Sequence, residues 1–226
     1  MQGLSYAVDI VLCIDKTGSM EPIIDAVKTN ALKFESDLQK FMVEKGRPVD
    51  KLRVRVIAFG DIYHDKGNWL KDSDFIPLPE RKEEFRAFVD SIKAEGGGDE
   101  PENALEALAL ATNSAWTKEG DKRRHLVVIW TDTTAHPLEL RSTRDASAAK
   151  LPSEMPSTLG GLIAMWNDPQ KMSKTDKRVV VFAPDADPWS NLYEELVGMV
   201  HVPTRAGHGM SELDYQQVLE QISNSL

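Results

Sequence analysis

The stretch Asp15-Lys16-Thr17-Gly18-Ser19-Met20 lies between an apolar run and a long helical pattern, and it decides the fold. Residues 8–14, directly before it, are almost all apolar and often β-branched, which predicts a strand buried on both faces. Directly after it, Glu21-Pro22 has the acid and the proline that are typical of the first turn of a helix. The hexapeptide is therefore predicted to form the turn between a buried strand and a helix.

Three side chains of this turn carry oxygen atoms two residues apart. Asp15 supplies a carboxylate, and Thr17 and Ser19 supply short hydroxyls. Such ligands suit a hard divalent cation, Mg²⁺ above all, and Gly18 lets the backbone bend closely around an ion. The same residue types are common in turns and caps, and Ser19 is an equally good candidate to cap the helix. The hexapeptide alone leaves a metal site and an ordinary turn as equal alternatives.

Length and composition limit the possible classes of protein. The chain has 226 residues, 41% of them hydrophobic, and we interpret residues 1–226 as a single α/β domain. The net charge of −9 and the lack of a long basic run argue against nucleic acid and anionic membranes as partners. The single cysteine, Cys13, lies inside the first predicted strand, and we interpret it as a core residue. No apolar stretch resembles a signal peptide or a membrane span, so we expect a cytoplasmic protein.

Strands and helices alternate along the rest of the chain. This alternation predicts a Rossmann-like, doubly wound, mostly parallel sheet with helices on both faces and one antiparallel edge strand. Further strands are expected at 52–59, 75–78 at the edge, 125–131, 178–183 and 200–202, and helices at 22–43, 83–94, 102–116, 159–166, 188–196 and 211–226. In such sheets the ligand lies at the carboxyl ends of the strands, where the connections that contain Asp15, Asp99 and Asp132 are predicted to converge.

Three stretches match one family in order and in kind. Asp15-Lys16-Thr17-Gly18-Ser19 resembles the D-x-S-x-S motif of von Willebrand factor type A domains. Gly97-Gly98-Asp99 stands where that family has a Gly-Gly-x-Thr loop, and Thr131-Asp132 resembles the Thr-Asp that ends its fourth strand. Together these motifs form the metal-ion-dependent adhesion site of the family. The chain is most similar to the bacterial and protist branch, which includes domains beside alpha-kinases and in tellurite-resistance systems.

The resemblance implies a function as well as a fold. It implies a bound Mg²⁺, or Mn²⁺ or Ca²⁺, held by Asp15, Thr17, Ser19, Asp99 and Asp132, and a protein partner that offers the ion a carboxylate or a neutral oxygen. By the family pattern Thr17 and Ser19 ligate directly, while Asp15 and Asp132 act mostly through water. It implies no catalysis. Asp99 replaces the threonine of the family, and it either ligates the ion or caps the next helix.

Other interpretations compete with this one. An Mg²⁺-dependent phosphoryl-transfer enzyme of a Rossmann-like fold is the alternative function, but such enzymes need a second acid two residues after Asp15, where Thr17 stands. His64 and His136, with Asp61 and Asp65, are candidates for a zinc cluster, although a polar role at the rim fits their spacing better. We interpret Glu100 and Glu102 as helix-capping acids and not as ligands. Trp189 is either a partner anchor or a core residue, and the long segment 133–177 beside Asp132 is either a partner-reading surface or a lid.

Overall fold

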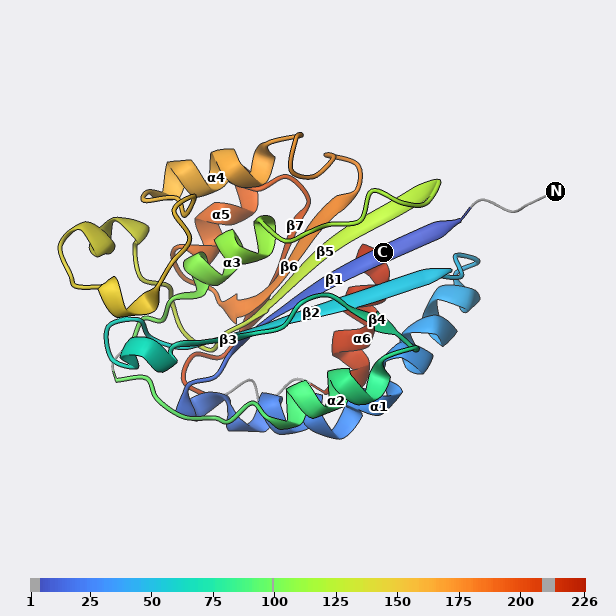
Figure 1. Ribbon diagram of the computed structural model, residues 1–226, viewed down its shortest axis with the longest axis horizontal. Coiled ribbons are helices and arrows are strands. Elements are labelled where there is room, and N and C mark those ends of the chain that lie inside the picture. Colours follow the sequence, from blue (N-terminus) through green and yellow to red (C-terminus); the bar gives the residue numbers. More distant parts are fainter. Residues whose placement is uncertain (1–4, 99, 209–213) are drawn as a thin grey trace.

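A seven-stranded sheet runs through the centre of the molecule (Figure 1). The computed structural model describes residues 5–98, 100–208 and 214–226. The strands follow the order β3-β2-β1-β5-β6-β7, with β4 paired to β2 off this path. Their bounds are β1 Tyr6–Asp15, β2 Lys51–Phe59, β3 Leu70–Asp72, β4 Ile76–Leu78, β5 Lys122–Trp130, β6 Lys177–Pro184 and β7 Met199–Thr204.

The sheet is parallel except at one edge, as the sequence predicts. Strand β1 pairs in parallel with both β2 and β5, and β5, β6 and β7 continue the parallel order. Both β3 and β4 run antiparallel to β2. The edge strand expected at 75–78 is confirmed as β4, whereas β3 is too short to leave a periodic pattern and was not predicted.

Helices cover both faces of the sheet, in two layers that are visible in Figure 1. Alternate residues of β1 supply the two cores: Ile10 and Leu12 belong to the cluster with α1, and Val11 and Cys13 belong to the cluster with α3. One layer contains α1 Glu21–Glu44, α2 Lys82–Asp90 and α6 Tyr215–Ser225, and the other contains α3 Ala104–Thr112, α4 Leu159–Asn167 and α5 Trp189–Glu195. Burial on both sides explains why the central strands are apolar throughout.

Several helix bounds differ from the sequence prediction. Helix α3 begins at Ala104 instead of residue 102, because Glu102 forms a parallel bridge with Ala135. Helix α6 begins after Asp214, whose carboxylate accepts from the backbone of Gln217 while the Gln217 side chain accepts from the backbone N–H of Asp214. Residues 211–213 of the helix predicted at 211–226 lie outside the described residues. Asp187 does not cap α5; it accepts a hydrogen bond from Asn191 within the helix.

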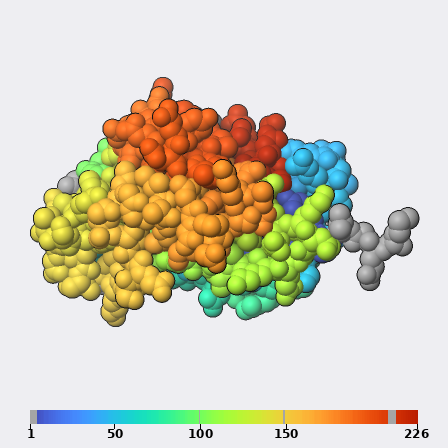
Figure 2. Space-filling model, turned by 90° about the horizontal axis from the view of Figure 1, so that it is seen from above, coloured from blue at the N-terminus to red at the C-terminus, as the bar shows by residue number. Residues whose placement is uncertain are grey.

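The segment 133–177 is a folded part of the domain. It contains the short 3-10 helices η3 Leu138–Ser142 and η4 Ser147–Ala149 as well as α4. Leu138, Leu162 and Trp166 are fully buried in the core above the sheet. Figure 2 shows this yellow-to-orange segment across a large part of one face of the molecule.

Candidate functional site

The carboxylate of Asp15 is the centre of the candidate site, at the end of β1. The side chain is fully buried, and its Oδ1 accepts hydrogen bonds from the Thr17 backbone at 2.9 Å and the Thr17 hydroxyl at 2.7 Å. Its Oδ2 accepts from the Thr131 hydroxyl at 2.8 Å. Burial raises the pKa of Asp15 to about 6; the hydrogen bonds oppose this rise and the nearby Asp132 carboxylate adds to it.

A second contact joins the turn after β1 to the end of β5. The exposed Ser19 hydroxyl donates to Oδ1 of Asp132 at 3.0 Å, although 113 residues separate them in the chain. Helix α1 has Met20 at its N-cap without a side-chain cap, so Ser19 is not a helix cap here. Parallel pairing of β1 with β5 places both strand ends at the same edge, which brings Asp15, Thr17, Ser19 and Asp132 together.

Glu102 lies at this site, and its interpretation as a capping acid is wrong. Its side chain is 4% exposed, and it precedes Asn103, the N-cap of α3, instead of occupying the first turn. A Cβ atom at Gly97 would lie 2.9 Å from Oε1 of Glu102 and 3.0 Å from Cγ2 of Thr17, so both side chains pack around this glycine. In the sequence, Glu102 is visible only as an acid that follows Pro101 near the start of a helix. The bridge between Glu102 and Ala135 shows that this acid precedes the helix.

The loop at 96–98 is held in place by Asp65. Its carboxylate accepts from the backbone of Gly97 at 3.0 Å and of Asp61 at 3.0 Å. A Cβ atom would come within 2.2 Å of this carboxylate at Gly96 and within 2.3 Å at Gly60. Glycine at these two positions therefore allows Asp65 to join the two loops beside the site. Asp99 itself lies outside the described residues.

The histidines gather around Asp61, which is fully buried. Oδ2 of Asp61 lies 3.7 Å from Nε2 of His64 and 3.6 Å from Nε2 of His136. His136 is only 3% exposed and packs edge-on against Tyr63, so the prediction that it lies at the rim is wrong. His64 is exposed, as the same prediction requires. Among the residues that the structure describes, no three His, Cys, Asp or Glu side chains form a metal-ligating group, which leaves the zinc interpretation without support.

The segment 133–177 is attached to the site through contacts with α3 and α5. Arg141 donates to Oε1 of the fully buried Glu106 in the first turn of α3, at 2.6 Å. Trp189 is fully buried and donates to the backbone oxygen of Thr133 at 3.1 Å, so it is a core residue and not an exposed anchor. These contacts fix the first part of the segment directly beside Asp132.

A model of the von Willebrand factor A domain matches residues 71–192, more than half of the chain. The chain belongs to the von Willebrand factor A domain family. The match includes Asp132 but begins after the Asp15–Ser19 turn. The sequence is also 29% identical over 143 residues to the alpha-protein kinase vwkA of Dictyostelium discoideum. That alignment covers 63% of this chain and 21% of the relative, so this chain spans about a fifth of its length.

Solved structures share the fold at low sequence identity. The pilus adhesin SpaC of Lactobacillus rhamnosus GG aligns with a TM-score of 0.57 at 13% identity, over 99% of this chain and 31% of the adhesin. The von Willebrand factor domain of the pilus tip protein Mfa5 of Porphyromonas gingivalis aligns with a TM-score of 0.50 at 12% identity, over 99% and 96% of the two chains. Within the described residues, no helix is long and apolar enough to cross a membrane.

Proposed function

We propose that this domain captures a protein partner through a divalent cation held at the carboxyl edge of its sheet. The observation that carries the proposal is the pair of contacts Thr17–Asp15 and Ser19–Asp132. They bring two hydroxyls and two carboxylates from separate strand ends to one place, and Ser19 keeps this place open to solvent. The pilus adhesin SpaC, which shares the fold, supports a role in binding.

The donor set fits Mg²⁺, with Mn²⁺ and Ca²⁺ as alternatives. All of its groups are oxygen donors, which hard cations prefer, and no thiol or imidazole is among them. The hydroxyls of Thr17 and Ser19 donate to carboxylates, and each oxygen keeps lone pairs with which it could ligate an ion. By the pattern of the family, we expect the hydroxyls to ligate directly and Asp15 and Asp132 to act mostly through water.

We add Glu102 to the proposed set, and Asp99 stays a predicted member. Glu102 places a buried carboxylate beside Thr17, whereas the sequence motifs indicate only Asp99 as a third acid. A partner then completes the shell of the ion with a carboxylate or a neutral oxygen. The exposed residues of 133–177, next to Asp132, are our proposed surface for partner choice.

We propose recognition rather than catalysis. Thr17 occupies the position of the second acid in the alternative phosphoryl-transfer enzyme, and its hydroxyl donates to Asp15 instead of facing a leaving group. The Dictyostelium relative is named a kinase, but this chain matches only 21% of that protein, so its name does not make this domain a kinase.

Calorimetric titration of the metal-free protein with Mg²⁺ and Mn²⁺ tests the proposal. We expect binding close to one ion per chain in the wild type and its loss in Asp132→Asn. Acetate, a mimic of a partner carboxylate, should bind only when the metal is present. Absence of metal binding at millimolar concentrations, or a metal-dependent phosphatase activity that Asp15→Asn removes, would contradict it.

A further inference from the structure

A large cavity lies at the opposite end of the sheet from the candidate ion site. Its volume is about 860 Å³, and its walls come from the start of β1, the end of α1, the start of β5 and the turn before β6. In Figure 1 this is the end where β1 begins, and the ion site is at the other end of the same strand. Ligand binding at the ion site therefore leaves this cavity free.

Basic side chains from separate elements meet here. Arg47 follows α1, and Lys122, Arg123 and Arg124 open β5. Arg178, in β6, lies close enough to Arg124 for the like charge to lower the pKa of its guanidinium, after the larger effect of burial. In a chain of net charge −9, such a concentration of cations is unusual and leaves a local excess of positive charge.

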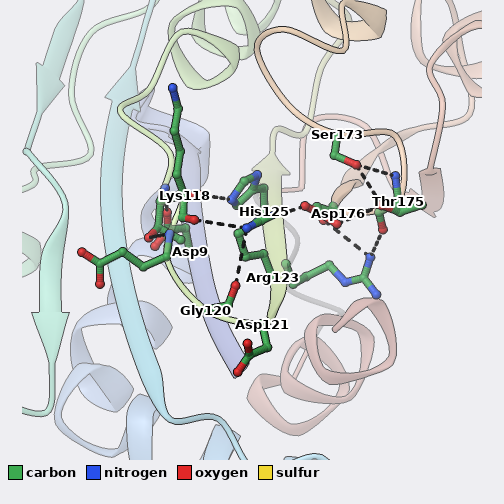
Figure 3. A network of polar contacts seen from close by, with 12 residues as sticks. Asp9, Lys118, Gly120, Asp121, Arg123, His125, Ser173, Thr175 and Asp176 are labelled. Carbon is green, nitrogen blue, oxygen red and sulfur yellow. Dashed lines mark hydrogen bonds and ion pairs between the residues drawn. The ribbon is translucent and has the colours of Figure 1, made fainter. Parts of the chain in front are cut away.

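Some of these cations are already held by the chain. Arg123 is bonded to Asp176 at 3.2 Å and to the backbone oxygens of Lys118 and Gly120, as Figure 3 shows. Arg124 donates to the backbone oxygens of Thr175 at 2.6 Å and Leu226 at 3.3 Å. Within the described part of the chain, the exposed side chains of Arg47 and Lys122 have no hydrogen bond or ion pair, so they are available to a ligand.

The acids of the same walls are engaged with backbone or with arginine. Asp50 accepts from the backbone of Tyr6 at 2.7 Å, and Asp121 accepts from the backbone of Ser5 at 2.9 Å. Asp176 is paired with Arg123. Each of the three carboxylates thus has a partner within the chain, whereas among the described residues the side chains of Arg47 and Lys122 have none.

We infer that this cavity binds a phosphate group. Phosphate oxygens match the planar, two-pronged donor geometry of arginine, and a doubly charged oxyanion gains from several converging cations. Arg47 and Lys122 contact the phosphate directly, and Arg124 adds its charge from the wall. Free phosphate, pyrophosphate and a phosphorylated side chain all present this group, and the test below distinguishes them.

The test is titration of the whole chain with inorganic phosphate, pyrophosphate and a short phosphoserine peptide, with EDTA present and the ionic strength constant. We expect saturable binding of at least one of them, and Arg47→Ala/Lys122→Ala should weaken it about tenfold or more, the scale of one charge-assisted hydrogen bond. The matched control Lys33→Ala/Lys40→Ala removes the same charge from the outer face of α1 and should bind like the wild type.

Three outcomes would overturn the inference: no wild-type binding at millimolar ligand, equal weakening in both double variants, or binding that the cavity variant leaves unchanged. Melting temperatures without ligand should agree among the three proteins, because the four substituted side chains are exposed. The comparison of the three ligands distinguishes a free anion from a phosphorylated chain. Since no metal is present, the result is independent of the proposed ion site.

Discussion

The Ser19 hydroxyl donates to the Asp132 carboxylate at 3.0 Å, across 113 positions of sequence. The contact connects the turn after β1 with the end of β5 at a point that solvent reaches, because Ser19 is exposed. The residues on the inner side, Asp15 and Thr131, are buried and bonded to each other. The site thus has a buried part that holds its geometry and an exposed part that can accept a ligand.

Ser19→Ala should weaken metal binding with little effect on folding. The hydroxyl is a proposed direct ligand, and its loss should weaken Mg²⁺ binding by about tenfold or more, the value of one strong polar contact. An exposed serine contributes little to stability, so the free energy of unfolding without metal should change by less than about 0.5 kcal/mol. Calorimetry and thermal melting measure the two effects.

Ser36→Ala is the matched control, because Ser36 is an exposed serine on the outer side of α1. It should bind metal like the wild type. Equal Mg²⁺ affinity in Ser19→Ala and the wild type would exclude Ser19 from the site.

Asp15→Asn should stabilise the metal-free protein at neutral pH. The folded pKa of about 6 lies above the ordinary 3.8, so the folded state holds the proton more tightly than the unfolded state. The contribution of Asp15 to stability is therefore present below pH 3.8 and is lost as the pH rises through about 6. At pH 7 the asparagine variant should therefore have a free energy of unfolding up to about 3 kcal/mol higher than that of the wild type.

The measurement is denaturant unfolding in EDTA over a range of pH, with the wild type beside the variant. The difference in unfolding free energy should shrink toward acid pH. Added Mg²⁺ should stabilise the wild type and not Asp15→Asn, since binding to the folded state alone raises its stability. A variant less stable than the wild type at neutral pH would contradict the prediction.

The strand-end residues could be predicted because each follows an apolar strand directly. The positions of Asp15 and Asp132 follow from the rule that parallel strands end at one edge, and in the structure the Asp132 carboxylate lies close enough to Asp15 for its charge to raise the pKa of Asp15. Glu102 could not be assigned in this way, because an acid before a helix is usually part of its first turn. Its burial depends on the bridge to Ala135, a contact between loops that no periodicity records.

The segment 133–177 shows the same limit. Its prolines break every helical pattern, yet Leu138 and Trp166 are fully buried in the core. Its order comes from side-chain contacts with α3 and with the loops, such as the Trp69 indole bonded to the Ala149 backbone at 3.1 Å. Contacts of this kind pair residues far apart in the chain, so they leave no local sequence signal.

Arg141→Met should destabilise the fold by about 3 kcal/mol or more, because it leaves the fully buried Glu106 without its partner. Arg144→Met is the control, since Arg144 is exposed and only stacks on Tyr63. Chemical unfolding measures both. Equal stability of the two variants would show that the ion pair does not hold the segment.

Partner choice should depend on the exposed residues of this segment alone. Removing 133–177 entirely is not a clean test, because buried residues would be lost with it. Exchanging Arg144, Asp145 and Lys150, which are exposed, should change what is captured and leave the Mg²⁺ affinity intact. A parallel loss of metal binding would place the segment inside the ion site.

Glu102→Gln should weaken metal binding and strengthen the binding of a carboxylate. With Asp15, Glu102 and Asp132 ionised, a site holding a 2+ ion carries a net charge near −1, and an ionised Asp99 would make it more negative. A partner carboxylate ~5 Å from one such extra charge is repelled by roughly 3 kcal/mol at an effective dielectric constant of about 20. This repulsion lowers the affinity for the carboxylate by about two orders of magnitude. The same charge tightens the hold on the metal.

Glu100→Gln is the matched control, because Glu100 is exposed in the same loop and its loss changes the total charge equally. Mg²⁺ and acetate titrations of both variants, with Asp99→Thr as a third, measure the effect of each acid. If Asp99→Thr also weakens the metal and strengthens acetate, Asp99 contributes its charge to the site; if both affinities stay unchanged, it acts only as a cap. If Glu102→Gln behaves like Glu100→Gln, the buried carboxylate beside Thr17 does not reach the ion, and the charge argument fails for Glu102.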